Sequence, residues 1–141
     1  MTRRKVWMSS PHTGGTRIPP LLQEETRRRI LAHANANYAG RFLRIAVRFR
    51  GAFCYIDAYC EPNPPTKALL RASNETERQY YERLGESPIH LCRLRYFAGR
   101  QRWTLAFYTY SHERYEPAVF PSGDMYGTPE EAFDVGAIYL Q

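Results

Sequence analysis

The amino-acid sequence predicts an α+β domain with a single antiparallel sheet of four to five strands, built from two hairpins and packed on one face by N- and C-terminal helices. Three observations predict this fold class. Four segments alternate between apolar and polar residues, which is typical of half-buried strands. Turn sequences join these segments in pairs, and helical patterns flank and separate the pairs. The length of 141 residues suits one hydrophobic core and is too short for two.

The first helix is predicted to run from Pro20 to about Ala36. Proline suits the first helical position, because its missing N–H would have no partner there. The segment before this helix contains glycine and proline residues that interrupt regular structure. We therefore expect a flexible basic arm over residues 1–19 and a single α+β domain over residues 20–141.

Two alternating segments follow, over residues 41–50 and 52–61. In each segment, side chains of one parity are mainly apolar, as expected for a strand with one buried face. The dipeptide Arg50-Gly51 between them predicts a tight hairpin turn. These two segments therefore form the first predicted hairpin.

An insert is predicted between the two hairpins. Three prolines indicate a loop over residues 61–73, and a helical pattern covers residues 74–84. Ser73 or Asn74 can cap the start of this short inserted helix, and Gly85 can end it.

The second hairpin is predicted over residues 89–97 and 102–111, and residues 115–120 add a short edge strand. The last helix begins after Thr128. The hydroxyl of Thr128 can cap the helix while the carboxylate of Glu131 completes a capping box. The order of elements therefore places helices at both ends of the sheet-forming region.

The alternation assigns the strand side chains to two faces. The face predicted to be buried consists of Leu43, Ile45, Val47, Phe49, Ile56, Ala58, Cys92, Leu94, Trp103, Leu105 and Phe107. The other face combines arginines and aromatic residues with one carboxylate, that of Asp57. Its candidate binding residues are Arg44, Arg48, Arg50, Phe53, Tyr55, Tyr59, Arg93, Arg95, Tyr108 and Tyr110.

This combination of residue types suits nucleic acid. Arginine binds phosphate through paired N–H groups, and aromatic rings stack on unpaired bases. We therefore expect a non-enzymatic module that binds single-stranded or structured DNA or RNA. One alternative is that the same face binds a protein partner or a second copy of the chain, because tyrosine and arginine are enriched in interface hot spots. Another is that the arginine stems and the rings simply cover one another.

The distribution of charge also favours a polyanionic partner. The chain has a net charge of +6, but residues 1–50 carry +9 and residues 111–141 carry −5. Such asymmetry is typical of nucleic-acid contact, although an acidic end that folds against a basic start would produce it too. Arginine supplies 18 of the 20 cationic side chains, which suits phosphate binding and equally fits a codon bias.

No cofactor and no metal ion are expected. Cys54 and Cys60 lie six residues apart on one predicted strand, about 20 Å if the strand is straight, so they cannot share a ligand. His90 and Cys92 are expected to point the same way, but the set has no recognised metal-ligand spacing. The cysteines are therefore interpreted as small buried apolar residues.

The sequence offers one weak catalytic hypothesis. Asp57 is predicted to pair with Arg93 or Arg95 on the arginine-rich face, and a small hydrolase built around Asp57 and His112 is a less favoured reading. The first ten residues lack the apolar core of a secretory signal, and no segment approaches the roughly 18 apolar residues of a membrane span. A cytoplasmic protein without membrane contact is expected.

Overall fold

The computed structural model describes residues 14–99 and 102–140, which form an α+β domain around one antiparallel sheet. The sheet has five strands in the order β1-β2-β3-β4-β5, so that each strand pairs with its neighbour in sequence. The strands are β1 (Arg44–Arg50), β2 (Phe53–Tyr59), β3 (Ile89–Phe97), β4 (Arg102–Thr109) and β5 (Arg114–Ala118). The predicted fold class is confirmed, with the predicted edge strand as the fifth strand.

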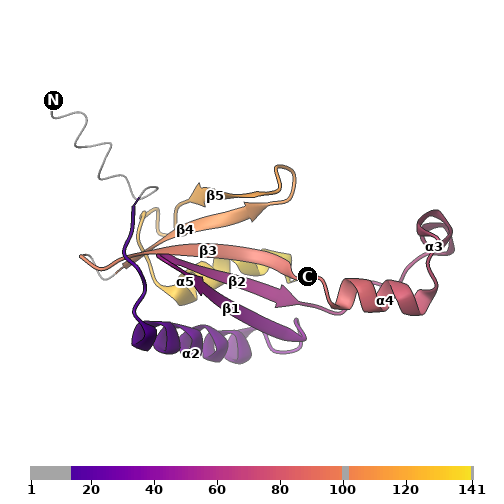
Figure 1. Cartoon of the computed structure of the whole chain (residues 1–141), viewed down its shortest axis with the longest axis horizontal. Coiled ribbons are helices and arrows are strands. Elements are labelled where there is room, and N and C mark those ends of the chain that lie inside the picture. Colours follow the sequence, from indigo (N-terminus) through magenta and orange to yellow (C-terminus); the bar gives the residue numbers. More distant parts are fainter. Residues whose placement is uncertain (1–13, 100–101, 141) are drawn as a thin grey trace.

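Two helices cover one face of the sheet (Figure 1). They are α2 (Pro20–Asn37) and α5 (Pro129–Gly136), and a short 3₁₀ helix, η1 (Ala137–Tyr139), follows α5. The predicted capping box at the start of α5 is present, with Thr128 and Glu131 as its two partners. Buried side chains of both helices and the strands form the core, among them Ile30, Ala34, Ile45, Val47, Ile56, Leu94, Leu105, Ala132 and Phe133. Within the described residues, no helix is long and apolar enough to cross a membrane.

Polar pairs also join the two covering helices. Arg29 on α2 forms a bidentate ion pair with Glu130 on α5, with N–O distances of 2.7 and 2.9 Å. His33 lies 2.7 Å from a carboxylate oxygen of Asp134. The acidic end of the chain therefore does fold against part of its basic start, and some of the charge asymmetry is neutralised on the helix side of the molecule.

Most of the predicted buried face is buried, namely Ile45, Val47, Ile56, Ala58, Cys92, Leu94, Trp103 and Leu105. Phe49 packs against this core while staying partly exposed. Phe107 is also only partly buried, and its ring stacks on that of Tyr139. The prediction for Leu43 is wrong, because 63% of its surface is exposed. Leu43 precedes β1, at an end of the sheet where the described residues do not cover it.

The residues just before α2 are attached to the sheet. The Thr16 N–H donates to the carbonyl oxygen of Tyr96 at 2.7 Å, and the Ile18 N–H donates to that of Gly51 at 3.0 Å. The Ile18 side chain is fully buried in the core. Residues 1–13 of the predicted arm lie outside the described residues.

The insert contains two helices rather than the single predicted one: α3 (Lys67–Ser73) and α4 (Glu77–Gly85). Asn74 adopts a left-handed conformation with φ of 56° and ends α3, so it does not cap a following helix. Thr76 caps α4 instead, in a capping box with Gln79. Helix α3 therefore occupies part of the segment predicted as a loop, and the predicted helix begins at Glu77 rather than at Asn74.

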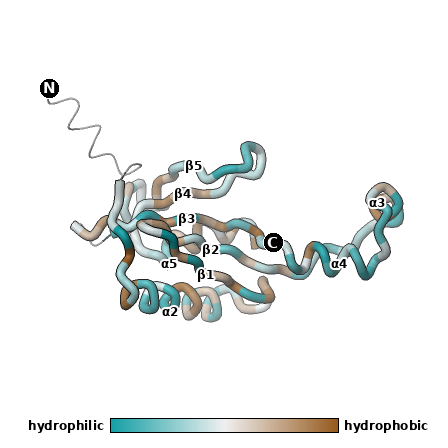
Figure 2. Tube along the Cα trace, viewed as in Figure 1, coloured by the Kyte–Doolittle hydropathy of each residue, from teal (hydrophilic) through white to brown (hydrophobic). Residues whose placement is uncertain are grey.

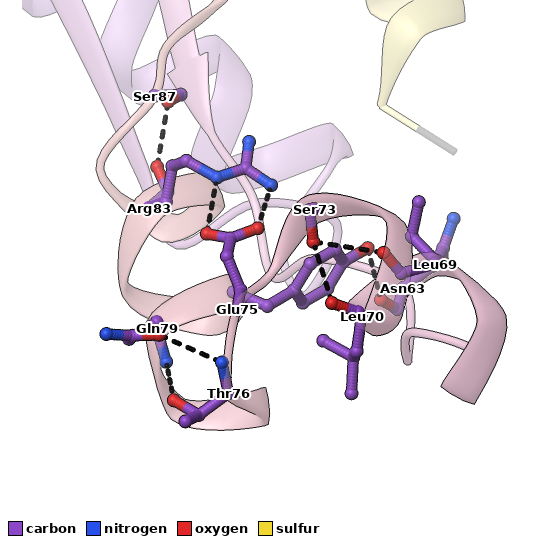
Figure 3. A network of polar contacts seen from close by, with 10 residues as sticks. Asn63, Leu69, Leu70, Ser73, Glu75, Thr76, Gln79, Arg83 and Ser87 are labelled. Atoms are coloured by element: carbon purple, nitrogen blue, oxygen red, sulfur yellow. Dashed lines mark hydrogen bonds and ion pairs between the residues drawn. The ribbon is translucent and has the colours of Figure 1, made fainter.

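The insert extends away from the end of the sheet, and hydrophilic residues predominate along α4 (Figures 1 and 2). Contacts within the insert join α4 to the segments on either side of α3 (Figure 3). Arg83 forms a bidentate ion pair with Glu75, both N–O distances being 2.8 Å, and this pairing lowers the pKa of the Glu75 carboxyl. The Tyr80 hydroxyl donates to the carbonyl oxygen of Asn63 at 3.1 Å.

A β-bulge interrupts the pairing of β2 with β3. Ile56 pairs with Cys92 and Asp57 pairs with His90, which leaves Leu91 as an extra residue on β3. The Leu91 side chain points into the core and is fully buried. Because of this extra residue, the side chains of β3 change face at the bulge.

Helix α5 packs closely over the bulge, at Gly136. A Cβ atom added to Gly136 would lie 2.8 Å from both the Cβ and the carbonyl oxygen of Leu91. Neither atom is the far end of a flexible side chain, so neither can move aside without shifting the backbone of β3. Close approach, rather than an unusual φ, therefore requires glycine at this position.

We expect Gly136→Ala to lower the free energy of unfolding by about 1–3 kcal/mol, because overpacking must shift α5 or the bulge. Urea denaturation measures this change. The matched control is Gly85→Ala, which also replaces the last residue of a helix but meets no atom within 4 Å. Equal stability of the two variants would contradict close packing at the bulge.

Candidate functional site

The face of the sheet opposite α2 and α5 carries arginine and aromatic side chains. Strand register places Arg48, Tyr55 and Arg93 in one row across β1, β2 and β3. Arg50, Phe53 and Arg95 form the next row. We call this surface the arginine–aromatic face and define it as Arg44, Arg48, Arg50, Phe53, Tyr55, Tyr59, Arg93, Arg95, Tyr108, Tyr110 and Tyr115.

The guanidinium groups of this face lie over its rings. The distance from the guanidinium carbon to the ring centroid is 3.9 Å for Arg44 over Tyr59 and 4.8 Å for Arg48 over Tyr55. Arg93 and Arg95 both lie over Phe53, at 4.3 and 4.6 Å. This is the mutual covering that the passive alternative describes. It also holds the guanidinium planes in place, which reduces the entropy lost when they bind a ligand.

The positive charge of the face is poorly compensated. Among the described residues, Arg44, Arg50, Arg93 and Arg95 form no ion pair with a carboxylate. Burial, together with the nearby charge of Arg93, lowers the pKa of Arg95. An anion bound between these arginines would relieve their repulsion.

Asp57 lies in the middle of the face, with only 4% of its side-chain surface exposed. Its Oδ2 atom accepts a hydrogen bond from Nε of Arg48 at 3.2 Å, and its Oδ1 atom lies 2.8 Å from Nδ1 of His90. The prediction that Arg93 or Arg95 is its partner is wrong. Both of those arginines stack on Phe53, while Arg48 reaches Asp57 diagonally from β1.

His90 faces the side opposite to Cys92, and the prediction that both point the same way is also wrong. The bulge at Leu91 shifts the alternation by one residue, so Cys92 is buried on the helix side and His90 turns toward Asp57. The His90 ring packs against Tyr108, with a centroid distance of 4.7 Å. Sequence reasoning missed this site residue, because no local residue pattern marks the bulge.

Tyrosines surround His90. The backbone N–H of His90 donates to the Tyr110 hydroxyl at 2.8 Å. Tyr108 contacts Tyr110 and Tyr115 edge-on, with centroid distances of 4.8 and 5.0 Å. The Tyr115 hydroxyl is buried without a hydrogen-bond partner among the described residues. Burial and, to a lesser extent, the charge of Asp57 raise its pKa.

His112 takes no part in this cluster. It pairs with Glu116 at the turn between β4 and β5, where the Thr109 hydroxyl donates to the same carboxylate. These hydrogen bonds, that of Thr109 first, lower the pKa of Glu116. The structure therefore joins Asp57 to His90, and it does not form the Asp57–His112 pair considered from the sequence.

The cysteines lie outside the arginine–aromatic face. Cys54 and Cys92 are buried, and burial raises the pKa of the Cys54 thiol to about 12. Cys60 is partly exposed beyond the end of β2. No group of three or more metal-ligating side chains occurs in the described part of the chain.

A groove of about 480 Å³ continues the surface beyond Tyr110. It is lined by the root of the insert and by mainly apolar side chains, including Leu84, Ile89 and Tyr139. Comparisons of the chain with protein-family models, with curated proteins and with solved structures give no match. The residues predicted from the sequence for binding share one side of strands β1 to β4, and Tyr110 follows directly after the last residue of β4.

We expect Asp57→Ala to lower the free energy of unfolding by about 1–3 kcal/mol, because Arg48 and His90 lose their shared acceptor. Urea denaturation gives the value. Glu24→Ala is the matched control, since it also removes the carboxylate of an ion pair, but an exposed one. Its expected effect is below about 1 kcal/mol. An equal loss of stability in both variants would show that the buried Asp57 ion pair stabilises the fold no more than an exposed ion pair does.

Proposed function

We propose that this protein binds single-stranded or structured nucleic acid on the arginine–aromatic face. One observation carries the proposal: arginines that lack carboxylate partners are stacked on aromatic rings across one face of the sheet. Phosphate oxygens would bind the N–H groups of Arg44, Arg50 and Arg93. Arg95 would contribute the N–H groups that remain after its Nη1 donates to the carbonyl oxygen of Gly14 at 2.9 Å. Unpaired bases would stack on the guanidinium planes and on the ring faces that the arginines leave uncovered, at about 1–3 kcal/mol per base.

The protein-interface alternative fits the surface less well. Stable protein interfaces contain a desolvated apolar centre surrounded by a polar rim. Here the centre holds charged groups, since Arg93 lies beside Tyr55 and the buried Asp57 follows two residues later on β2. The most exposed large apolar side chains, Leu21 and Leu43, lie in α2 and before β1. Charged groups at the centre of the face favour a polyanionic partner over a protein interface.

The double variant Arg93→Gln/Arg95→Gln tests the electrostatic part of the proposal. We expect it to bind a labelled single strand about 10-fold more weakly at low salt, and to flatten the plot of log affinity against log salt by about 1.4, or about 0.7 for each lost phosphate contact. Fluorescence anisotropy at several salt concentrations measures both quantities.

The control for this variant is Arg28→Gln/Arg78→Gln, which removes the same charge from α2 and α4. Both of these arginines are exposed and lie outside the arginine–aromatic face. Equal losses of affinity in the two double variants would show that the protein attracts nucleic acid through its net charge alone. Absence of binding by the unmodified protein at micromolar concentration would contradict the proposed function.

Tyr59→Ala tests base stacking separately from charge. Removing the ring leaves Arg44 in place but takes away its stacking partner. We expect affinity for single strands to fall by about 5- to 150-fold, corresponding to about 1–3 kcal/mol, while duplex affinity changes far less. Tyr81→Ala on α4 is the matched control, and it should change neither affinity. Equal losses for single strands and duplex would exclude stacking at Tyr59.

A further inference from the structure

We propose that the Asp57–His90 pair makes the arginine–aromatic face a site of RNA cleavage, in which His90 acts as the general base. This inference rests on the proposed function, because the same face must first bind the strand. It goes beyond that function by assigning chemistry to a pair of residues that binding alone does not require.

The geometry of the pair determines which nitrogen of His90 can react. The Asp57 carboxylate accepts a hydrogen bond from Nδ1 at 2.8 Å, so the proton of the neutral ring resides on Nδ1. The Nε2 atom then carries the free lone pair of a base. Asp57 is nearly inaccessible, whereas 31% of the His90 side chain is exposed. Asp57 is therefore the positioning residue, and His90 is the group that a ligand can reach.

The bulge is the backbone feature that creates this pair. Without the extra residue Leu91, the alternation of β3 would turn His90 into the helix-covered core beside Cys92. With it, His90 reaches the open face, and its backbone N–H is held by the Tyr110 hydroxyl at 2.8 Å. Bulges of this kind commonly redirect a side chain beside an active site.

Three histidines pair with carboxylates, but only one pair has this environment among the described residues. His33 pairs with Asp134 on the helix side, and that carboxylate is 46% exposed. His112 pairs with Glu116, which is 33% exposed, at a hairpin turn. The carboxylate that pairs with His90 is buried, and its second oxygen forms an ion pair with Arg48. Burial and neighbouring arginines together distinguish His90.

The proposed step is an internal transesterification of RNA. Nε2 of His90 takes the proton of a 2′-hydroxyl, and the 2′-oxygen forms a bond to the adjacent phosphorus. The bond from phosphorus to the 5′-oxygen breaks, and that oxygen takes a proton from water. The products are a 2′,3′-cyclic phosphate and a 5′-hydroxyl, and the imidazolium returns its proton to solvent.

Arginines would stabilise the extra negative charge on the phosphoryl oxygens in the transition state. Arg48 is held beside the pair by its hydrogen bond to Asp57, and 55% of its side chain remains exposed. Arg93 lies over the ring of Tyr115, 5.3 Å from its centroid. Since the nucleophile is the 2′-hydroxyl, DNA can bind to this face but cannot react.

The test uses the full chain, a labelled single-stranded RNA and a DNA of the same sequence. We expect cleavage of the RNA alone, with cyclic phosphate ends identified by mass spectrometry. His90→Asn removes the base but keeps an amide N–H that can bond to Asp57. It should slow cleavage at least about 100-fold, the usual contribution of a general base, with little change in RNA affinity. Asp57→Asn should lower kcat while KM stays within about twofold.

His33→Asn is the matched control and should cleave at the unmodified rate. Equal rates for His90→Asn and His33→Asn would assign cleavage to a contaminant and overturn the inference. Cleavage of DNA would overturn it as well, because the nucleophile would then be different. RNA that binds but stays intact would refute the cleavage site and leave the proposed function standing. Absence of both binding and cleavage would refute the two proposals together.

Discussion

A carboxylate buried in the middle of a sheet needs partners, and the partners of Asp57 connect three strands. Arg48 comes from β1, Asp57 from β2 and His90 from β3. Leaving such a charge unpaired in a region of low dielectric would cost several kcal/mol, roughly the net stability of many small domains. The cluster of Arg48, Asp57 and His90 therefore depends on the register of the first three strands and on the position of the bulge.

The two sides of the sheet differ in whether their charged side chains are paired. On the helix side, basic residues of α2 meet acidic residues of α5, as in the Arg29–Glu130 pair. On the open side, Arg93 and Arg95 stack on Phe53 and meet no carboxylate within the described residues. A net charge of +6 therefore understates how positive the open side is. The surface available to a polyanion is a product of topology as much as of composition.

Much of the fold follows from local patterns in the sequence, and the details of the site do not. Period-two alternation predicts the strands and the arginine–aromatic face, because side-chain direction in a regular strand depends only on parity. The bulge at Leu91 breaks that rule through tertiary packing against Gly136, which no local pattern encodes. Strand parity therefore places His90 on the wrong face. It also gives Asp57 the wrong partner, because parity does not show that Arg93 and Arg95 stack on Phe53 while Arg48 reaches Asp57 from β1. The two-helix insert escapes prediction for a different, local reason, since Asn74 suits either end of a helix and here ends α3.

The central claim is that nucleic acid binds to the open face of the sheet. The most direct measurement is an amide chemical-shift map recorded while a short single-stranded RNA is titrated into the protein at low salt. Binding as described predicts the largest shifts along β1, β2 and β3, around Arg48, Tyr55 and Arg93, with little change in α2 or α4. Shifts confined to the helices, or none at micromolar concentration, would contradict it.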